Sequence, residues 1–274
     1  MRGAILLGAF ALALAAVASP GFAAQPQLWG IDLQPAASPV MEDIRWFHNQ
    51  ILFPLITVIS VFVLGLMVYV FVRFNRKANP TPSNFTHNTT VEILWTVIPV
   101  IILVVIAVPS FKLLYKADSI AEPEMTLKVT GNQWYWSYEY PDHGSFEFDS
   151  NILEGDDLPE GAPRLLSVDN KVVLPVETDI RILVGANDVL HNWAVPAFGI
   201  KIDTVPGRLL ETWVRITKPG TYYGQCSELC GLRHAYMPIE VQAVSKEEFN
   251  AWVTKAQAEY GVPDGAPTNL AAAQ

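Results

Sequence analysis

Two long stretches of the chain are apolar at every position rather than on one face. Residues 51–72 and 93–111 contain no charged side chain. Each has close to the ~20 residues with which a helix crosses ~30 Å of hydrocarbon. Three prolines lie in these stretches, at 54, 99 and 109, and membrane helices tolerate them. The pattern predicts two transmembrane helices joined by a loop over residues 73–92.

A third apolar segment lies at the amino terminus. Arg2 precedes an apolar run over residues 4–18, and the small residues Ala23 and Ala24 follow. This arrangement is typical of a secretory signal peptide, which would cover residues 1–24 and leave a mature chain that starts near Gln25, outside the cytoplasm.

The basic residues do not decide how the two helices are oriented. Three basic residues lie in the loop between the two apolar stretches, Arg73, Arg76 and Lys77, and three flank the other ends, Arg45, Lys112 and Lys116. The positive-inside rule therefore gives a tie. The predicted signal peptide decides it, because a translocated amino terminus places loop 73–92 in the cytoplasm. Residues 25–116 then form an external segment and a membrane anchor, and everything after residue 116 is external.

After a linker over residues 117–123, short apolar or alternating runs replace the long ones, with proline, glycine, asparagine and aspartate between them. Such runs predict β-strands, here over residues 125–130, 133–140, 165–168, 179–184, 191–195, 209–216, 221–225 and 238–244. Many short strands with turn signals favour an antiparallel sandwich or barrel.

A helix is predicted to close this domain over residues 245–260. Ser245 is the expected N-cap, Glu248 completes a capping box, and Phe249 and Trp252 share one face. The external domain is therefore expected to cover residues 117–260. The small and polar residues 261–274 are expected to form a disordered tail.

The external part of the chain is strongly acidic. Residues 117–274 carry 11 basic and 23 acidic side chains, a net charge of −12. This charge disfavours nucleic acid and would attract a basic protein partner. Solubility explains any single carboxylate equally well.

Candidate chemistry is concentrated in one segment with the spacing Cys226-x3-Cys230-x3-His234-x2-Met237, which holds the only two cysteines of the chain. Outside the cytoplasm, two cysteines usually form a disulfide. A disulfide here would close a very short loop and would leave His234 and Met237 without a role.

A metal site gives every one of these side chains a role. Zinc would need a second imidazole, from His143 or His191. Methionine favours copper instead, because a thioether is a soft ligand that contributes nothing to a structural zinc site. Two cysteines can bridge two copper ions, with His191 on one ion, His234 on the other and Met237 as a weak ligand.

Three segments carry a resemblance to a known family: "GNQWYWSYEYP", "VLHNWAVPAFGIKIDTVPGR" and "YYGQCSELCGLRHAYMPIEV". In order and spacing, residues 39–252 resemble subunit II of bacterial cytochrome c oxidases of the haem-copper type. The resemblance implies a two-helix transmembrane hairpin followed by an all-β, cupredoxin-like Greek-key barrel. It also implies a multi-pass protein of the bacterial inner membrane with its large C-terminal domain on the periplasmic side.

The resemblance further implies a binuclear, mixed-valence copper centre, CuA. The ligands that it carries over are His191, Cys226, Glu228 through its carbonyl, Cys230, His234 and Met237. The side chain of Glu228 is also implied as a ligand of a magnesium ion shared with subunit I.

The function implied is that of an electron relay in a proton-pumping oxidase. Electrons would pass from cytochrome c to the copper pair and then to a haem in subunit I, where dioxygen is reduced to water. Neither apolar stretch contains a histidine, so the chain is not expected to hold the oxygen-reducing centre. The implied partners are subunit I, further oxidase subunits, cytochrome c and membrane lipid.

Two further roles are implied outside the copper ligands. Trp134 would receive the electron from docked cytochrome c, although an aromatic stripe that includes it, Trp136, Tyr138 and Tyr140 is usually core. Glu92 would mark the cytoplasmic mouth of a proton path, although a carboxylate also suits a helix amino terminus. The candidate docking carboxylates are Asp142, Asp149, Asp188 and Asp203.

Two alternatives stay open. A quinol oxidase subunit II has the same anchor and barrel without copper, but retention of both cysteines, both histidines and the methionine argues against it. A membrane-tethered copper-binding or copper-delivery protein would have a more exposed site. Nitrous-oxide reductase shares the copper loop but not a hairpin anchor ahead of the barrel.

Overall fold

The structure is a computed structural model that describes residues 22–81, 83–119 and 122–261. The signal-peptide prediction lies outside these ranges up to residue 21, and so does the predicted tail from residue 262 onward. Phe22–Ala24 forms a short strand, β1, which pairs in parallel with Gly220–Tyr222 of the barrel.

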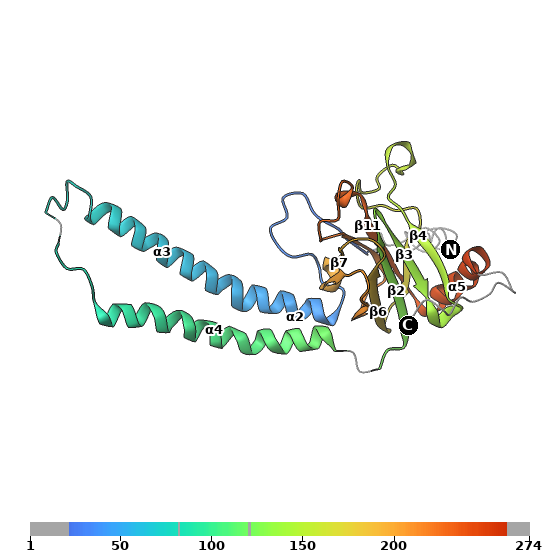
Figure 1. Ribbon diagram of the computed structural model, residues 1–274, viewed down its shortest axis with the longest axis horizontal. Helices are drawn as coiled ribbons and strands as arrows, with labels where there is room; N and C mark the ends of the chain where they lie inside the picture. The colour runs from blue at the N-terminus through green and yellow to red at the C-terminus, as the bar shows by residue number, and fades with distance from the viewer. Residues whose placement is uncertain (1–21, 82, 120–121, 262–274) are drawn as a thin grey trace, which may run out of the picture.

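The hairpin is built from two long helices that lie side by side and end at the barrel (Figure 1). Helix α2 (Pro39–Phe47), a π-helical turn (His48–Leu52) and α3 (Phe53–Arg73) run on as one helix, and α4 (Thr89–Asp118) returns. Both uncharged stretches lie inside these helices. The helices continue beyond them because their ends are capped: the Ser38 side chain accepts from the Met41 amide, and the Asn88 side chain from that of Val91.

Within the described residues, the domain that follows α4 contains ten strands and a closing helix, with the following bounds: β2 (Met125–Asn132), β3 (Tyr135–Tyr140), β4 (Phe146–Ser150), β5 (Val172–Pro175), β6 (Asp179–Ala186), β7 (His191–Val195), β8 (Ile200–Thr204), β9 (Leu210–Arg215), β10 (Gly220–Gln225), β11 (Pro238–Val244) and α5 (Lys246–Tyr260). One sheet has the order β4-β3-β2-β6-β9, the second β1-β10-β11-β5, and β7 pairs with β8. The predicted class, two apolar helices followed by an all-β domain, is confirmed.

The sheets are mixed rather than antiparallel throughout. Strand β2 pairs in parallel with β6, and β11 in parallel with β5. The reason is that the chain leaves the first sheet after β4, adds β5 to the second sheet, and then returns as β6. Strands that are distant in sequence thereby become neighbours, as in Greek-key connections.

The strand predicted over residues 165–168 is wrong. Residues 164–166 form a turn, in which Leu165 has a φ of 65° that no strand accommodates, and only Val168 makes an isolated bridge, to Ile152. Strands β4, β5 and β8 were not predicted, although β4 alternates clearly, with Phe146 and Phe148 buried and Glu147 exposed.

Helix α5 begins as predicted. The Ser245 hydroxyl accepts a hydrogen bond from the Glu248 amide at 3.2 Å, and the Glu248 carboxylate accepts one from the Ser245 amide at 3.0 Å. The helix buries Phe249, Val253 and Ala256 against β4 and β5, the edge strands of the two sheets. It covers the end of the barrel core opposite the cysteine loop.

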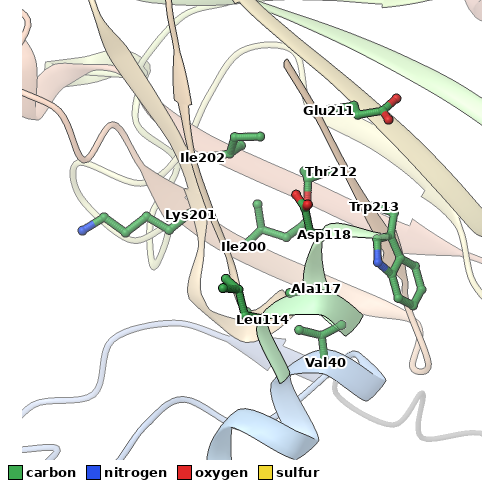
Figure 2. Close-up of a pocket in the computed structure, with 11 residues that line it drawn as sticks. Val40, Leu114, Ala117, Asp118, Ile200, Lys201, Ile202, Glu211, Thr212 and Trp213 are labelled. Atoms are coloured by element: carbon green, nitrogen blue, oxygen red, sulfur yellow. The ribbon is translucent and has the colours of Figure 1, made fainter. Parts of the chain in front are cut away.

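The hairpin is fixed to the barrel by hydrogen bonds at its outer end. Ala37 bonds through its amide to the Ala197 carbonyl and through its carbonyl to the Thr217 amide, and the Trp213 indole donates to the Lys116 carbonyl. Gly199 has a φ of +71°, and a Cβ there would lie 2.7 Å from Ile44 of α2. Figure 2 shows the remaining space at this junction, a cavity of about 200 Å³ between the helix ends and strands β8 and β9.

Candidate metal centre

The candidate ligands come from two parts of the barrel. His191 is the first residue of β7, and the other five lie in the loop between β10 and β11, whose base is closed by the pair Gln225 and Pro238. Strand β10 approaches β7 so closely that a Cβ on Gly224 would lie 2.0 Å from the Ala194 carbonyl oxygen. A side chain there would separate the strands, so glycine brings the loop onto His191.

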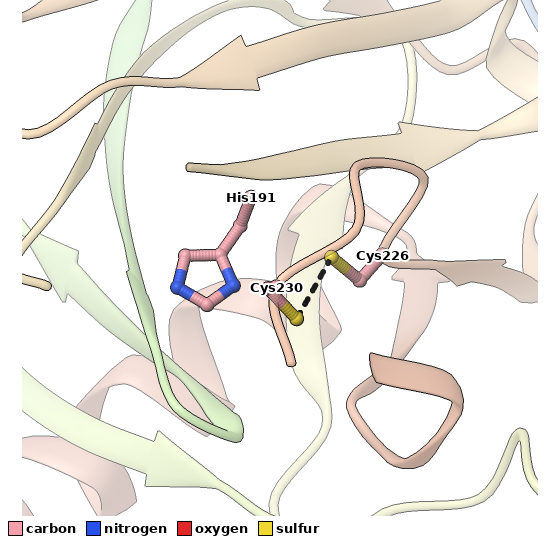
Figure 3. Close-up of side chains that lie close together, drawn as sticks. All are labelled: His191, Cys226 and Cys230. Atoms are coloured by element: carbon pink, nitrogen blue, oxygen red, sulfur yellow. Dashed lines mark hydrogen bonds between the residues drawn. The ribbon is translucent and has the colours of Figure 1, made fainter. Parts of the chain in front are cut away.

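The two thiols are close together but not bonded. Their sulfur atoms are 3.9 Å apart, whereas a disulfide bond is about 2.05 Å long. Both cysteines are buried. The ligand atoms of His191, Cys226 and Cys230 lie within 4.8 Å of one another. Figure 3 shows one ring nitrogen of His191 directed at the two sulfur atoms.

The other three candidate ligands lie around the same sulfur atoms. His234 Nδ1 and Met237 Sδ are each 3.5 Å from the Cys230 sulfur, and the Glu228 carbonyl oxygen is 3.3 Å from the Cys226 sulfur. Met237 is 1% exposed, whereas the Glu228 side chain is exposed. The structure therefore brings all six residues together.

The orientation of His191 fits metal binding. The ring is fully buried; Nε2 lies 2.8 Å from the Asp188 carboxylate, and Nδ1 has no hydrogen-bond partner. A buried nitrogen without a partner is costly unless something binds it. Two thiols and a thioether are soft donors and, together with two imidazoles, suit copper; the Glu228 carbonyl oxygen is a harder donor beside them.

The two thiols differ in acidity. Burial alone would raise the pKa of Cys226, but interactions with His191 and the Asn192 amide outweigh it and lower that pKa. Burial, and then the neighbouring Cys226 thiolate, raise the pKa of Cys230. Cys226 therefore loses its proton first, and a metal that binds both sulfurs must displace the proton of Cys230.

Burial alone would also lower the pKa of His191, but the Cys226 thiolate and the Asp188 carboxylate raise it. Burial would raise the pKa of Asp188; its hydrogen bonds with His191 and with the amides of Val189 and Gln133 lower it instead. The pair holds the imidazole in one orientation.

Three residues that the sequence did not identify as supports hold the site from outside. Asp188, expected only as a docking carboxylate, orients His191, and its position three residues before that histidine was the available signal. Gln133 donates to the Cys230 carbonyl at 2.7 Å, and the Trp136 indole to the Met237 carbonyl at 3.1 Å. Nothing in the sequence pattern indicated the last two contacts.

Trp134 lies outside the aromatic stripe in which it was predicted. Trp136, Tyr138 and Tyr140 are fully buried, whereas Trp134 occupies the two-residue turn between β2 and β3 and is partly buried. The turn is required because Asn132 pairs directly with Tyr135. The Trp134 indole donates to the Cys230 carbonyl at 3.3 Å, so the ring rests on the cysteine loop.

The four candidate docking carboxylates are exposed, but they do not lie together. Asp188 and Asp203 flank the β7 region, where the Asp203 carboxylate accepts from the Asn192 amide group at 2.6 Å. Asp149 accepts from Ser137, three residues along from Trp134. Asp142 bonds the Thr126 amide, at the opposite end of β2 from the cysteine loop.

Two other candidates lie away from the site. His143 packs edge-on against Phe249 of α5, with ring centres 5.2 Å apart, so it is not the second imidazole. Glu92 is in the first turn of α4, at the end of the hairpin remote from the barrel (Figure 1), and its carboxylate accepts from the Asn88 amide.

Comparison with known proteins matches both parts of the chain. Residues 125–244 match the family model "Cytochrome C oxidase subunit II, periplasmic domain", and residues 26–113 match its transmembrane domain.

Individual relatives cover most of the chain. A probable cytochrome c oxidase subunit 2 of Rickettsia prowazekii is 54% identical over 85% of this chain and 74% of its own length. The cytochrome c oxidase subunit 2 of Oenothera berteroana is 50% identical over 85% of this chain and 91% of its own.

A solved structure, the periplasmic domain of subunit II of cytochrome oxidase from Bradyrhizobium japonicum, is 51% identical. It covers 52% of this chain and 99% of its own, with a TM-score of 0.49. From the two family domains in order and the extent of the sequence identity, it follows that the chain belongs to the family of cytochrome c oxidase subunit II.

Proposed function

We propose that the chain is the electron-accepting subunit of a proton-pumping cytochrome c oxidase, which takes electrons from cytochrome c and delivers them to a haem in subunit I for the reduction of dioxygen to water. The proposal extends the family assignment to a mechanism. One observation carries it: the Glu228 carbonyl, His234 and Met237 lie around two unbonded thiols, beside a buried nitrogen of His191 that has no hydrogen-bond partner.

Two copper ions would be held by the Cys226 and Cys230 sulfurs, His191, His234, Met237 and the Glu228 carbonyl, and would supply reversible one-electron exchange. The chain's own contribution is a fixed frame. Residues on two strands and one turn hold the loop: Gln133, Trp134, Trp136 and Asn192. Such a frame keeps the ligands in place when the charge of the site changes.

Trp134 is the side chain best placed to connect the protein surface with the site. Its ring is partly exposed, and its indole nitrogen reaches the carbonyl of Cys230. No other aromatic residue in the described part of the chain donates to that carbonyl. We assign to it the receipt of the electron from cytochrome c.

The acidic surface suits a basic electron donor. Asp149 and Asp188 lie on the same side as the Trp134 turn, because Asp149 bonds Ser137 and Asp188 bonds the Gln133 amide. These two are the preferred docking carboxylates. Asp142 lies too far along the sheet, and Asp203 flanks the other edge of the site.

Contact with subunit I is assigned to the exposed side of the cysteine loop. The Glu228 side chain is exposed while its carbonyl faces Cys226, so one residue would join this site to a magnesium ion shared with subunit I. In this arrangement the barrel is periplasmic, loop 73–92 is cytoplasmic, and Glu92 lies at the cytoplasmic membrane surface.

Electron paramagnetic resonance with metal analysis tests the proposal on the full chain in detergent, loaded with copper. Two copper ions per chain sharing one unpaired electron are expected. Cys226→Ser should abolish or convert that signal with the fold intact. Met237→Leu should alter the signal, whereas the matched control Met125→Leu, at a buried methionine of β2, should not.

A single-copper signal, or a copper-free chain with a disulfide between the two cysteines, would contradict the proposal and favour a copper-handling protein or a quinol oxidase subunit. Docking is tested separately by reduction kinetics with cytochrome c. Asp149→Asn should weaken the interaction at low salt, and Asp142→Asn is the matched control. Equal effects of the two variants would remove the docking assignment.

A further inference from the structure

A second cavity lies at the membrane end of the molecule, remote from the cysteine loop. It is a cleft of about 470 Å³ between α2 and α4, at the end of the hairpin that joins the barrel (Figure 1), lined by Asp43, Trp46, Phe47, Pro109, Lys112, Leu113 and Lys116. Lys112 is the first charged residue after the uncharged stretch 93–111. The cleft therefore lies where hydrocarbon gives way to lipid headgroups.

The charges around the cleft leave one positive group uncompensated. Lys116 lies on α4, one helical turn nearer the barrel than Lys112, and forms an ion pair with Asp43 of α2. Arg45, also on α2, pairs with Asp32. The Lys112 ammonium has no hydrogen-bond or ion-pair partner among the residues that the structure describes. A single lysine ammonium is thus available to a single anionic group.

The rest of the lining is apolar and continuous with the membrane spans. Trp46 is 58% exposed on α2 beside Phe47, and Pro109 and Leu113 face it from α4. Tryptophan prefers the level of lipid carbonyls and glycerol, because its ring is apolar and its N–H is polar. The cleft thus combines one cationic group, one interfacial aromatic ring and an apolar wall.

We propose that this cleft binds one phospholipid of the leaflet on the barrel side. Its phosphodiester pairs with the Lys112 ammonium, its glycerol region packs beside Trp46, and an acyl chain lies along Phe47, Pro109 and Leu113. One uncompensated positive charge matches one phosphodiester, and the apolar wall continues into the bilayer. The inference rests on the membrane hairpin and does not depend on copper or on electron transfer.

Native mass spectrometry of the full chain in detergent, titrated with phosphatidylglycerol, tests the site. The wild-type chain should retain one lipid more strongly than the others. Lys112→Gln should weaken this binding about fivefold, and Lys112→Arg should preserve it. The matched control is Lys77→Gln, which removes an exposed lysine at the other end of the hairpin and should leave the binding unchanged.

Three results would overturn the proposal. In the first, Lys112→Gln and Lys77→Gln bind phosphatidylglycerol equally. In the second, glycerol phosphate competes at equal concentration, which would make the cleft a phosphate site and not a lipid site. In the third, the assembled oxidase retains the same lipids with and without the Lys112→Gln substitution, which would mean that another subunit covers the cleft.

Discussion

The substitution Gly131→Ala tests how tightly the barrel positions His191. Gly131 lies near the end of β2, under the imidazole ring, and a Cβ there would be 2.8 Å from His191 Cδ2 and 3.0 Å from Cγ. Carbon atoms in ordinary contact are about 3.5 Å apart. The ring, or the strand beneath it, must therefore move by roughly 0.7 Å.

The ring has little freedom to make this movement. Nε2 is held at 2.8 Å by Asp188, and the ring is fully buried and packs edge-on against Trp136, with centres 5.9 Å apart. Added volume in such a site typically costs 1–3 kcal/mol, here about 2 kcal/mol. For a domain of this size, that corresponds to a fall in melting temperature of about 8 °C.

The displaced imidazole should also weaken copper binding by about 10- to 100-fold, the range found when the groups that orient a ligand are disturbed. The assay compares thermal melting of the copper-free chain and copper retention against a chelator. Gly185→Ala is the matched control, because Gly185 lies on the neighbouring strand β6 and a Cβ there meets nothing closer than 3.4 Å. If the two variants melt and retain copper alike, His191 is not held as rigidly as argued.

Three further predictions concern other residues. Trp134→Phe, which removes the hydrogen bond to the cysteine loop, should slow reduction by cytochrome c in stopped-flow measurements without loss of copper; an unchanged rate would remove its special role. Lys171→Met should lower the free energy of unfolding in urea by about 3 kcal/mol, because it leaves the buried Glu240 carboxylate without its cation, whereas Lys255→Met, at an exposed site, should change little. Burial, with a smaller effect of Glu240, raises the pKa of Tyr223 to about 12, above its usual value of about 10, so the stability it contributes is present below about pH 10 and is lost as pH rises toward about 12. Urea unfolding measured across this pH range should show a smaller loss of unfolding free energy for Tyr223→Phe than for the wild-type chain. Equal losses in the two proteins would refute the assignment.

The membrane helices and the closing helix could be predicted because their signals are local. An uncharged run of membrane length and a capping box each specify an element without reference to the rest of the chain. Strand β5 could not be found in this way. It consists of Val172–Pro175, only four residues, all buried, and it exists because β11 offers a parallel edge. The cupredoxin-like class followed from the resemblance, and the family assignment confirms it.

The cluster of candidate ligands could be predicted because these side chains have few other uses in such close spacing. Two of the groups that support the loop, Gln133 and Trp136, could not be predicted, because their contacts join segments that are distant in sequence. Asp188 lies only three residues before His191, so its position was a usable signal and only its role was missed. Aromatic alternation misplaced Trp134 for a related reason: the pattern continues past the point at which β2 and β3 turn. The alternation of apolar residues predicts which side chains face inward, but it does not predict where a strand ends.

The order of the strands has a consequence for how the protein matures. The parallel pairs β2–β6 and β5–β11 join segments dozens of residues apart, and β7 meets the cysteine loop only when β10 closes on it through Gly224. Contacts between distant segments form late and slowly during folding. Until β10 closes on β7, both thiols would therefore be separated from His191, whose contacts with Asp188 and with Thr204 of β8 join residues close in sequence. For the proposed copper centre, metal insertion would therefore follow folding of the barrel and would not nucleate it.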